Sequence, residues 1–69
     1  MEQRKELLTL GAKLKAVRES LGLSQEQFAH KCALTKNYIG MLERGERNPS
    51  YLTLLQVARG LDISINKLL

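Results

Sequence analysis

Two short amphipathic segments, separated by a very short corner, restrict the fold of this chain more than any other feature. Ser24 followed by Gln27 is a capping-box pattern, and it predicts a helix over residues 25–32. Thr35 is a typical helix cap, and it predicts a second helix over residues 36–44. Because only about three residues connect the two helices, their axes must cross steeply.

That crossing decides which side chains are buried and which stay exposed. Ala29 is small enough to let the two backbones approach each other. The candidates for a shared apolar seam are Phe28, Cys32, Leu34, Ile39 and Leu42. The side chains left at the front of the second helix are Thr35, Lys36, Asn37, Gly40 and Met41. A DNA major groove admits an α-helix, and Lys and Asn reach guanine and adenine edges, so this front predicts DNA recognition.

A longer helix is expected before this pair. Apolar residues recur three or four positions apart over residues 6–21, which is the spacing of one helix face. Gly11 weakens the interior of that helix, so its ordered part is expected to start near this glycine. Gly22 follows as a residue typical of a helix C-cap.

Two further helices are expected after the pair. Gly45 should end the second helix of the pair, and a loop with the only proline follows it. A fourth helix is predicted over residues 51–60, closed by Gly60 and Asp62, and a short last helix over residues 65–69. No stretch shows a strand pattern of any length. The predicted fold class is therefore all-α, with five helices in a single domain that covers the whole chain.

Composition narrows the partners that such a domain could bind. The chain has 11 Lys and Arg residues against 7 Asp and Glu residues, which gives a net charge of +4. This moderate excess fits nucleic acid, an anionic membrane surface or an acidic partner, and it also occurs in small domains for no specific reason. No apolar run is long enough to span a membrane, and the N-terminal stretch lacks the apolar run of a signal peptide, so we expect a cytoplasmic protein.

Few side chains could carry catalysis or hold a metal. A single Cys32 cannot form an internal disulfide, and its place in the apolar seam favours a packed core thiol over a redox sensor. The only histidine, His30, is expected at a solvated helix position rather than as a pH switch. With no paired carboxylates, no nucleophile beside a base and no phosphate-binding glycine loop, we expect no enzymatic activity, no metal and no cofactor.

Over residues 10–69, the chain resembles the Cro and phage-repressor (XRE) helix-turn-helix family of DNA-binding regulators. The resemblance is carried by LGAKLKAVRESLGLSQEQFAHKCALTKNYIGMLERGERNPS and, further on, by LLQVARGLDIS. Within the family, NYIGMLERGERNPS most resembles the controller proteins of restriction–modification systems, which are small homodimers. The resemblance implies a five-helix domain with a helix-turn-helix over about residues 25–44. The many apolar residues towards the C-terminus predict a dimerisation region over about residues 50–69.

The resemblance also implies roles for individual residues. Gln25 matches a glutamine that lies by the DNA phosphate backbone, and Asn48 matches a backbone contact. Lys36 and Asn37 match positions that read bases, with Thr35 as a cap or a phosphate contact. With these residues the protein would bind double-stranded DNA and would catalyse no reaction on it.

Other matched residues have more than one possible role. Tyr38 and Arg47 match a tyrosine and an arginine near the DNA, although Tyr38 could instead belong to the core. Met41 either touches a thymine methyl group or flanks the core. Arg18 and Glu43 match an ion pair of the family, which we expect to be partly buried.

Two positions depart from the family pattern. Ala33 stands where the corner usually has glycine, and a left-handed conformation there would cost alanine on the order of 1 kcal/mol. Lys36 stands where controller proteins often carry arginine, which leaves its base preference open because lysine lacks the planar fork of arginine. Arg44 and Lys31 are either ordinary solvated charges or functional contacts.

The C-terminal part of the chain has more apolar residues than one small core can hide. The expected inward stripe of the fourth helix consists of Leu54, Val57, Ala58 and Leu61. An exposed apolar group on a small domain suggests an interface. The residues expected in a dimer interface are Leu52, Leu55, Ile65, Asn66 and Leu69. The alternative is that Ile65 and Leu69 close the lower edge of the protein's own core.

Taken with the resemblance, these features predict a sequence-specific transcriptional regulator. It would bind double-stranded DNA as a homodimer on a near-palindromic operator, as a restriction–modification controller protein does. Two alternatives stay open, namely a stand-alone repressor of another locus and an antitoxin- or adaptor-type protein-interaction module on the same fold. RNA polymerase also stays open as a further partner, since a controller-like regulator would both activate and repress.

Overall fold

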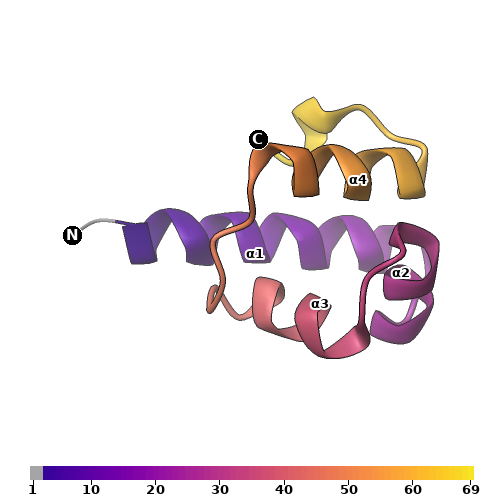
Figure 1. Ribbon diagram of the computed structural model, residues 1–69, viewed down its shortest axis with the longest axis horizontal. Coiled ribbons are helices and arrows are strands. Elements are labelled where there is room, and N and C mark those ends of the chain that lie inside the picture. The colour runs from indigo at the N-terminus through magenta and orange to yellow at the C-terminus, as the bar shows by residue number, and fades with distance from the viewer. Residues whose placement is uncertain (1–2) are drawn as a thin grey trace.

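The computed structural model describes residues 3–69, and this part of the chain is all-helical, without strands (Figure 1). Its elements are the α-helices α1 (Gln3–Ser20), α2 (Gln25–Cys32), α3 (Lys36–Glu43) and α4 (Tyr51–Leu61) and the short 3₁₀ helix η1 (Ile65–Lys67). The predicted all-α class is confirmed. The predicted count of five helices is not confirmed, because only four are α-helices and the expected short last helix is a 3₁₀ helix of three residues, Ile65–Lys67. Between Gln3 and Leu69, no helix is long and apolar enough to cross a membrane.

Helix α1 is longer than the prediction that placed its start near Gly11, because it already begins at Gln3. Gly11 is buried where α1 passes the C-terminal end of α3. A Cβ atom at this position would lie 2.5 Å from the carbonyl oxygens of both Leu42 and Glu43. The glycine is therefore explained by the close approach of two backbones, rather than by the start of a helix.

Replacement of Gly11 by alanine is expected to destabilise the fold by about 2 kcal/mol. Alanine is the better helix former by roughly 1 kcal/mol, but overpacking against backbone costs roughly 1–3 kcal/mol or more. The matched control is Ala16→Gly at an exposed position of α1, which reports the helix propensity alone. Urea unfolding of the three proteins measures both effects, and a Gly11→Ala variant that is more stable than the wild type would contradict the close approach.

The start of α2 follows the predicted capping pattern, and the corner between α2 and α3 has the expected left-handed residue. The Ser24 hydroxyl accepts a hydrogen bond from the backbone N–H of Gln27, and the Gln27 side chain accepts one from the N–H of Ser24. Ala33 ends α2 in the left-handed region with φ 58°, so the expected cost of alanine at this corner applies. The Gln56 side chain from α4 donates a hydrogen bond of 2.7 Å to the carbonyl of Cys32, which ties this corner to α4.

Helix α4 packs on α2, and its buried stripe is the predicted one, consisting of Leu54, Val57, Ala58 and Leu61. Asp62 closes α4, as predicted, and the structure shows it in the left-handed region. Gly60 does not close it, because this residue lies within the helix. A Cβ atom on Gly60 would lie 2.6 Å from the carbonyl oxygen of Lys31, so Gly60 lets α4 approach the end of α2.

Candidate nucleic-acid interface

Helix α3 has one buried side and one open side. Ile39 and Leu42 are fully or almost fully buried, whereas Lys36 and Asn37 in its first turn are exposed. The Thr35 hydroxyl accepts a hydrogen bond from the backbone N–H of Tyr38 and so fixes the start of the helix. In Figure 1, α3 and α4 lie on opposite sides of α1, so α4 does not cover the open side of α3.

The open side of α3 continues into a shallow hollow of about 480 Å³. The residues that line it are Gln25, Lys36, Asn37, Gly40 and Arg44. The structure therefore brings Gln25 from the start of α2 next to Lys36 and Asn37, as the resemblance implied for residues on one DNA-facing surface. Donors of both amide and cationic type meet here, which suits contact with base edges and phosphates.

Three side chains hold α3 against α1 and α2. The Arg18 guanidinium on α1 donates to both carboxylate oxygens of Glu43, at 2.6 and 3.1 Å, and also to the carbonyl oxygen of Leu23. The Gln25 amide donates a further hydrogen bond of 3.0 Å to the same carboxylate. The Arg18 and Glu43 side chains are only 11% and 5% exposed, and the hydrogen bond to Glu43 raises the pKa of Arg18.

This network gives Gln25 a second role beside the phosphate contact that the resemblance implies. Its amide nitrogen is committed to Glu43, so the orientation of the side chain is fixed at the start of α2. The network thereby joins α1, α2 and the end of α3 into one unit behind the exposed residues. The position of Lys36 and Asn37 relative to the rest of the fold depends on it.

Tyr38 has a mixed position rather than a purely internal or purely exposed one. It is half-buried and packs against the core. Its ring also faces Arg47 of the loop after α3, whose guanidinium carbon lies 5.5 Å from the ring centroid. At this distance a cation–π interaction links the loop to α3. Met41 is likewise half-buried on the same helix.

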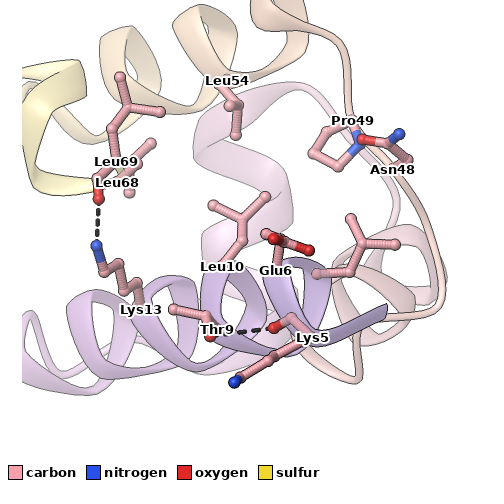
Figure 2. A pocket seen from close by; sticks show the side chains of 11 residues that line it. Lys5, Glu6, Thr9, Leu10, Lys13, Asn48, Pro49, Leu54, Leu68 and Leu69 are labelled. Atoms are coloured by element: carbon pink, nitrogen blue, oxygen red, sulfur yellow. Dashed lines mark hydrogen bonds between the residues drawn. The ribbon is translucent and has the colours of Figure 1, made fainter. Parts of the chain in front are cut away.

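The loop after α3 is held against the N-terminal half of α1. Gly45 has φ 75°, and a Cβ atom there would lie 2.9 Å from a methyl carbon of Leu8. Arg47 and Asn48 follow in exposed positions. Asn48 lines a different hollow, of about 620 Å³, which Figure 2 shows between α1, this loop, Leu54 and the C-terminal residues. The structure thus separates Asn48 from the hollow that contains Gln25, Lys36 and Asn37.

The residues expected in a dimer interface fall into two groups. Leu52, which is 74% exposed, and half-buried Leu55 line one hollow between α2 and α4. Leu69 is exposed but lines the other hollow, where its backbone carbonyl accepts a hydrogen bond from Lys13 (Figure 2). Ile65 is half-buried against the core, and Asn66 is exposed on η1.

The two residues with reactive side chains lie as predicted. Cys32 is buried in the core at 2% exposure, and its burial raises the pKa of the thiol, as expected for a packed thiol rather than a reactive one. His30 is exposed on α2. Neither residue lines the hollow on the open side of α3.

The sequence interpretation left Arg44 open, and the structure places it beside Lys36 and Asn37. Lys36, Gly40 and Arg44 are four residues apart, so they form one row along the open side of α3. The guanidinium of Arg44 lies over Gly40, with one nitrogen 3.1 Å from where a Cβ atom of Gly40 would be. The spacing of four residues was a signal in the sequence that could have identified this position.

A model of the helix-turn-helix family matches residues 14–68. The chain belongs to this family. The controller protein C.AhdI from Aeromonas hydrophila, known from a high-resolution crystal structure, has the same fold with a TM-score of 0.94 at 36% identity, and the match covers 100% of both chains. The chain is therefore a helix-turn-helix DNA-binding regulator of the XRE type, related to restriction–modification controller proteins.

Relatives identified by sequence agree with this assignment. The control proteins C.SmaI of Serratia marcescens and C.MunI of Mycoplasma sp are 42% identical over 60 residues and 39% identical over 62 residues. The immunity repressor protein of Bacillus phage phi105 is 39% identical over 59 residues. The match spans 86–88% of this chain, 71% and 84% of the two control proteins, and only 41% of the phage repressor.

Proposed function

We propose that this helix-turn-helix regulator binds a near-palindromic operator as a homodimer and reads its sequence with the open side of α3. The observation that carries the proposal is the hollow in which Lys36 and Asn37 meet Gln25 on an uncovered helix face. Lys36 and Asn37 contact base edges in the major groove, because their donors and acceptors match those of guanine and adenine. Gln25 and Thr35 at the two helix starts contact phosphates.

The loop after α3 contributes contacts to the DNA backbone. Arg47 is exposed and lies over the ring of Tyr38, and the neighbouring Asn48 is exposed on the same loop, where it lines the other hollow. Tyr38 positions the guanidinium of Arg47, and its hydroxyl reaches the same DNA strand. Met41 lies one turn beyond Asn37 and contacts a thymine methyl group. Cationic contacts release counterions from the DNA, so the affinity falls steeply with salt concentration.

A second copy of the chain completes the site. Exposed Leu52 and half-buried Leu55 form an apolar group on α4, and an apolar group left open to solvent on so small a domain is a reason to expect a partner. Ile65, Asn66 and Leu69, on and after η1, are the second group of proposed interface residues. A two-fold dimer would set two α3 helices about one DNA turn apart, roughly 34 Å, which requires two inverted half-sites.

Substitution of Leu52 by glutamate is expected to convert the dimer to a monomer, because it places charge in the centre of the apolar contact. Sedimentation equilibrium of wild type and variant measures the dimer dissociation constant, which we expect to rise by roughly 30-fold to 900-fold given ~2–4 kcal/mol for a central interface residue. Leu21→Glu is the matched control, because Leu21 is also an exposed leucine but lies at the end of α1. Equal mass for wild type and the Leu52 variant would contradict this interface.

We further propose that the protein is the controller of a restriction–modification system. Its similarity to C.SmaI, C.MunI and C.AhdI supports this proposal. Depending on which operator copies are filled, such a regulator would repress by blocking the promoter or activate by contact with RNA polymerase. The neighbouring reading frames test the proposal. Adjacent genes for a methyltransferase and an endonuclease support it, whereas phage genes instead favour the repressor that the similarity to the phi105 protein indicates.

A further inference from the structure

Arg44 and Glu46 form an ion pair at the end of α3 that none of the functional assignments above uses. The guanidinium donates two hydrogen bonds to the carboxylate, from Nε at 2.8 Å and from Nη2 at 3.2 Å. Both side chains are about half exposed. The hydrogen bond from Arg44 lowers the pKa of the Glu46 carboxyl, so the pair is ionised at neutral pH.

The backbone fixes this pair in place. Gly45 turns the chain with φ 75°, and its N–H donates to the carbonyl of Leu42. The N–H of Glu46 donates to the carbonyl of Met41, which completes a Schellman motif at the end of α3. Glu46 therefore comes back beside Arg44 through main-chain hydrogen bonds, and its carboxylate accepts the hydrogen bonds of the Arg44 guanidinium.

Arg44 itself lies on that open side. It lines the same hollow as Lys36 and Asn37, and its guanidinium crosses Gly40, where the lack of a side chain leaves room for it. Eight residues of helix separate Lys36 from Arg44, a rise of about 12 Å. That distance is comparable to the width of the major groove, also about 12 Å. If Lys36 reaches base edges within the groove, the guanidinium of Arg44 lies beside the backbone phosphates that border the groove.

We propose that Arg44 is an additional DNA-contacting residue that exchanges its ion-pair partner on binding. In the free protein its guanidinium is paired with Glu46, and in the complex it is paired with a DNA phosphate. The proposal rests on the proposed function, since it assumes that the open side of α3 faces DNA. A phosphate diester offers the guanidinium a similar bidentate geometry to that of a carboxylate. Glu46 would then lower the affinity, because its negative charge stays beside the DNA after Arg44 has left it.

A double-mutant cycle tests this exchange. The probe is a fluorescent duplex selected by the wild-type chain from a random library, titrated at several salt concentrations. Arg44→Ala is expected to weaken binding about 5-fold to 10-fold and to reduce the slope of log affinity against log salt by about 1. Glu46→Gln, which keeps the shape and removes the charge, is expected to tighten binding about 2-fold to 5-fold.

The control for charge alone is Asp62→Asn, which makes the same charge change at the end of α4. Asparagine tolerates the left-handed conformation that Asp62 adopts there. We expect Glu46→Gln to tighten binding more than Asp62→Asn does, and to lose most of this gain when Arg44 is already alanine.

Three results would overturn the exchange. These are an unchanged affinity of Arg44→Ala, equal effects of Glu46→Gln and Asp62→Asn, and a gain from Glu46→Gln that persists without Arg44. A wild-type chain that selects no sequence at all is a different outcome, because it contradicts the proposed function before any variant is measured. A wild-type chain that binds its selected duplex while the cycle shows no coupling contradicts only the role of Arg44 and Glu46.

Discussion

Replacement of Lys36, Asn37 and Arg47 together with alanine is expected to reduce affinity for the proposed operator by at least about 100-fold, while the proposed dimer and the fold stay intact. Each good base contact supplies ~1–3 kcal/mol, and the loss of two cations also lowers the salt dependence. The three side chains are exposed, so their removal leaves the core unchanged. Fluorescence anisotropy with a selected duplex measures the affinity, and circular dichroism during heating measures the stability.

The control for this variant removes the same number of cations elsewhere. Lys15 on α1 and Lys67 on η1 are exposed and line no part of the hollow on α3. Their joint replacement with alanine is expected to weaken binding far less than the triple substitution, through net charge alone. If both variants lose the same affinity, or if the triple variant still binds its target unchanged, α3 does not read DNA through these residues.

The Arg18→Met substitution is expected to destabilise the fold by about 3 kcal/mol. The guanidinium of Arg18 supplies both carboxylate oxygens of Glu43 with hydrogen bonds, and the carboxylate is 5% exposed. Removal of one partner leaves a nearly buried charge with only the amide of Gln25 as a donor. Since a chain of this length has a total stability of roughly 3–10 kcal/mol, the variant is expected to be partly unfolded near 37 °C.

The double substitution Arg18→Met and Glu43→Leu separates the ion pair from packing. It removes both charges, so it is expected to recover a large part of the stability that Arg18→Met loses. Urea unfolding of the wild type, both single variants and the double variant gives the coupling free energy. If the double variant is as unstable as the sum of the two single variants, Arg18 and Glu43 act independently, contrary to the hydrogen bonds seen between them.

Local signals explain why the central pair of helices could be predicted almost to the residue. Ser24 with Gln27 and the lone Thr35 are hydrogen-bonding caps whose effect depends on a few neighbouring residues. The spacing of apolar residues on α4 likewise reports its buried stripe. The exposed face of α3 follows from the two caps and the short corner between them, because this corner leaves only one side of α3 free.

Features that depend on distant parts of the chain could not be predicted in the same way. From the sequence, Gly11 is predicted to lie near a helix start and Gly60 at a helix end, but each lies where two backbones pass each other. No local pattern distinguishes a glycine needed for contact from one that ends a helix. The ion pair of Arg44 with Glu46 depends on the turn at Gly45. The two separate hollows lined by Leu52 and by Leu69 depend on how α4 and η1 pack.

Selection of bound sites from a random duplex library, at a stated salt concentration near physiological, measures most directly whether the open side of α3 reads DNA. The account predicts enrichment of two inverted half-sites whose centres lie about one helical turn apart, roughly 10 base pairs. It also predicts that the variant lacking Lys36, Asn37 and Arg47 enriches no such sequence. A wild-type chain that returns only unordered, random sequences would contradict it.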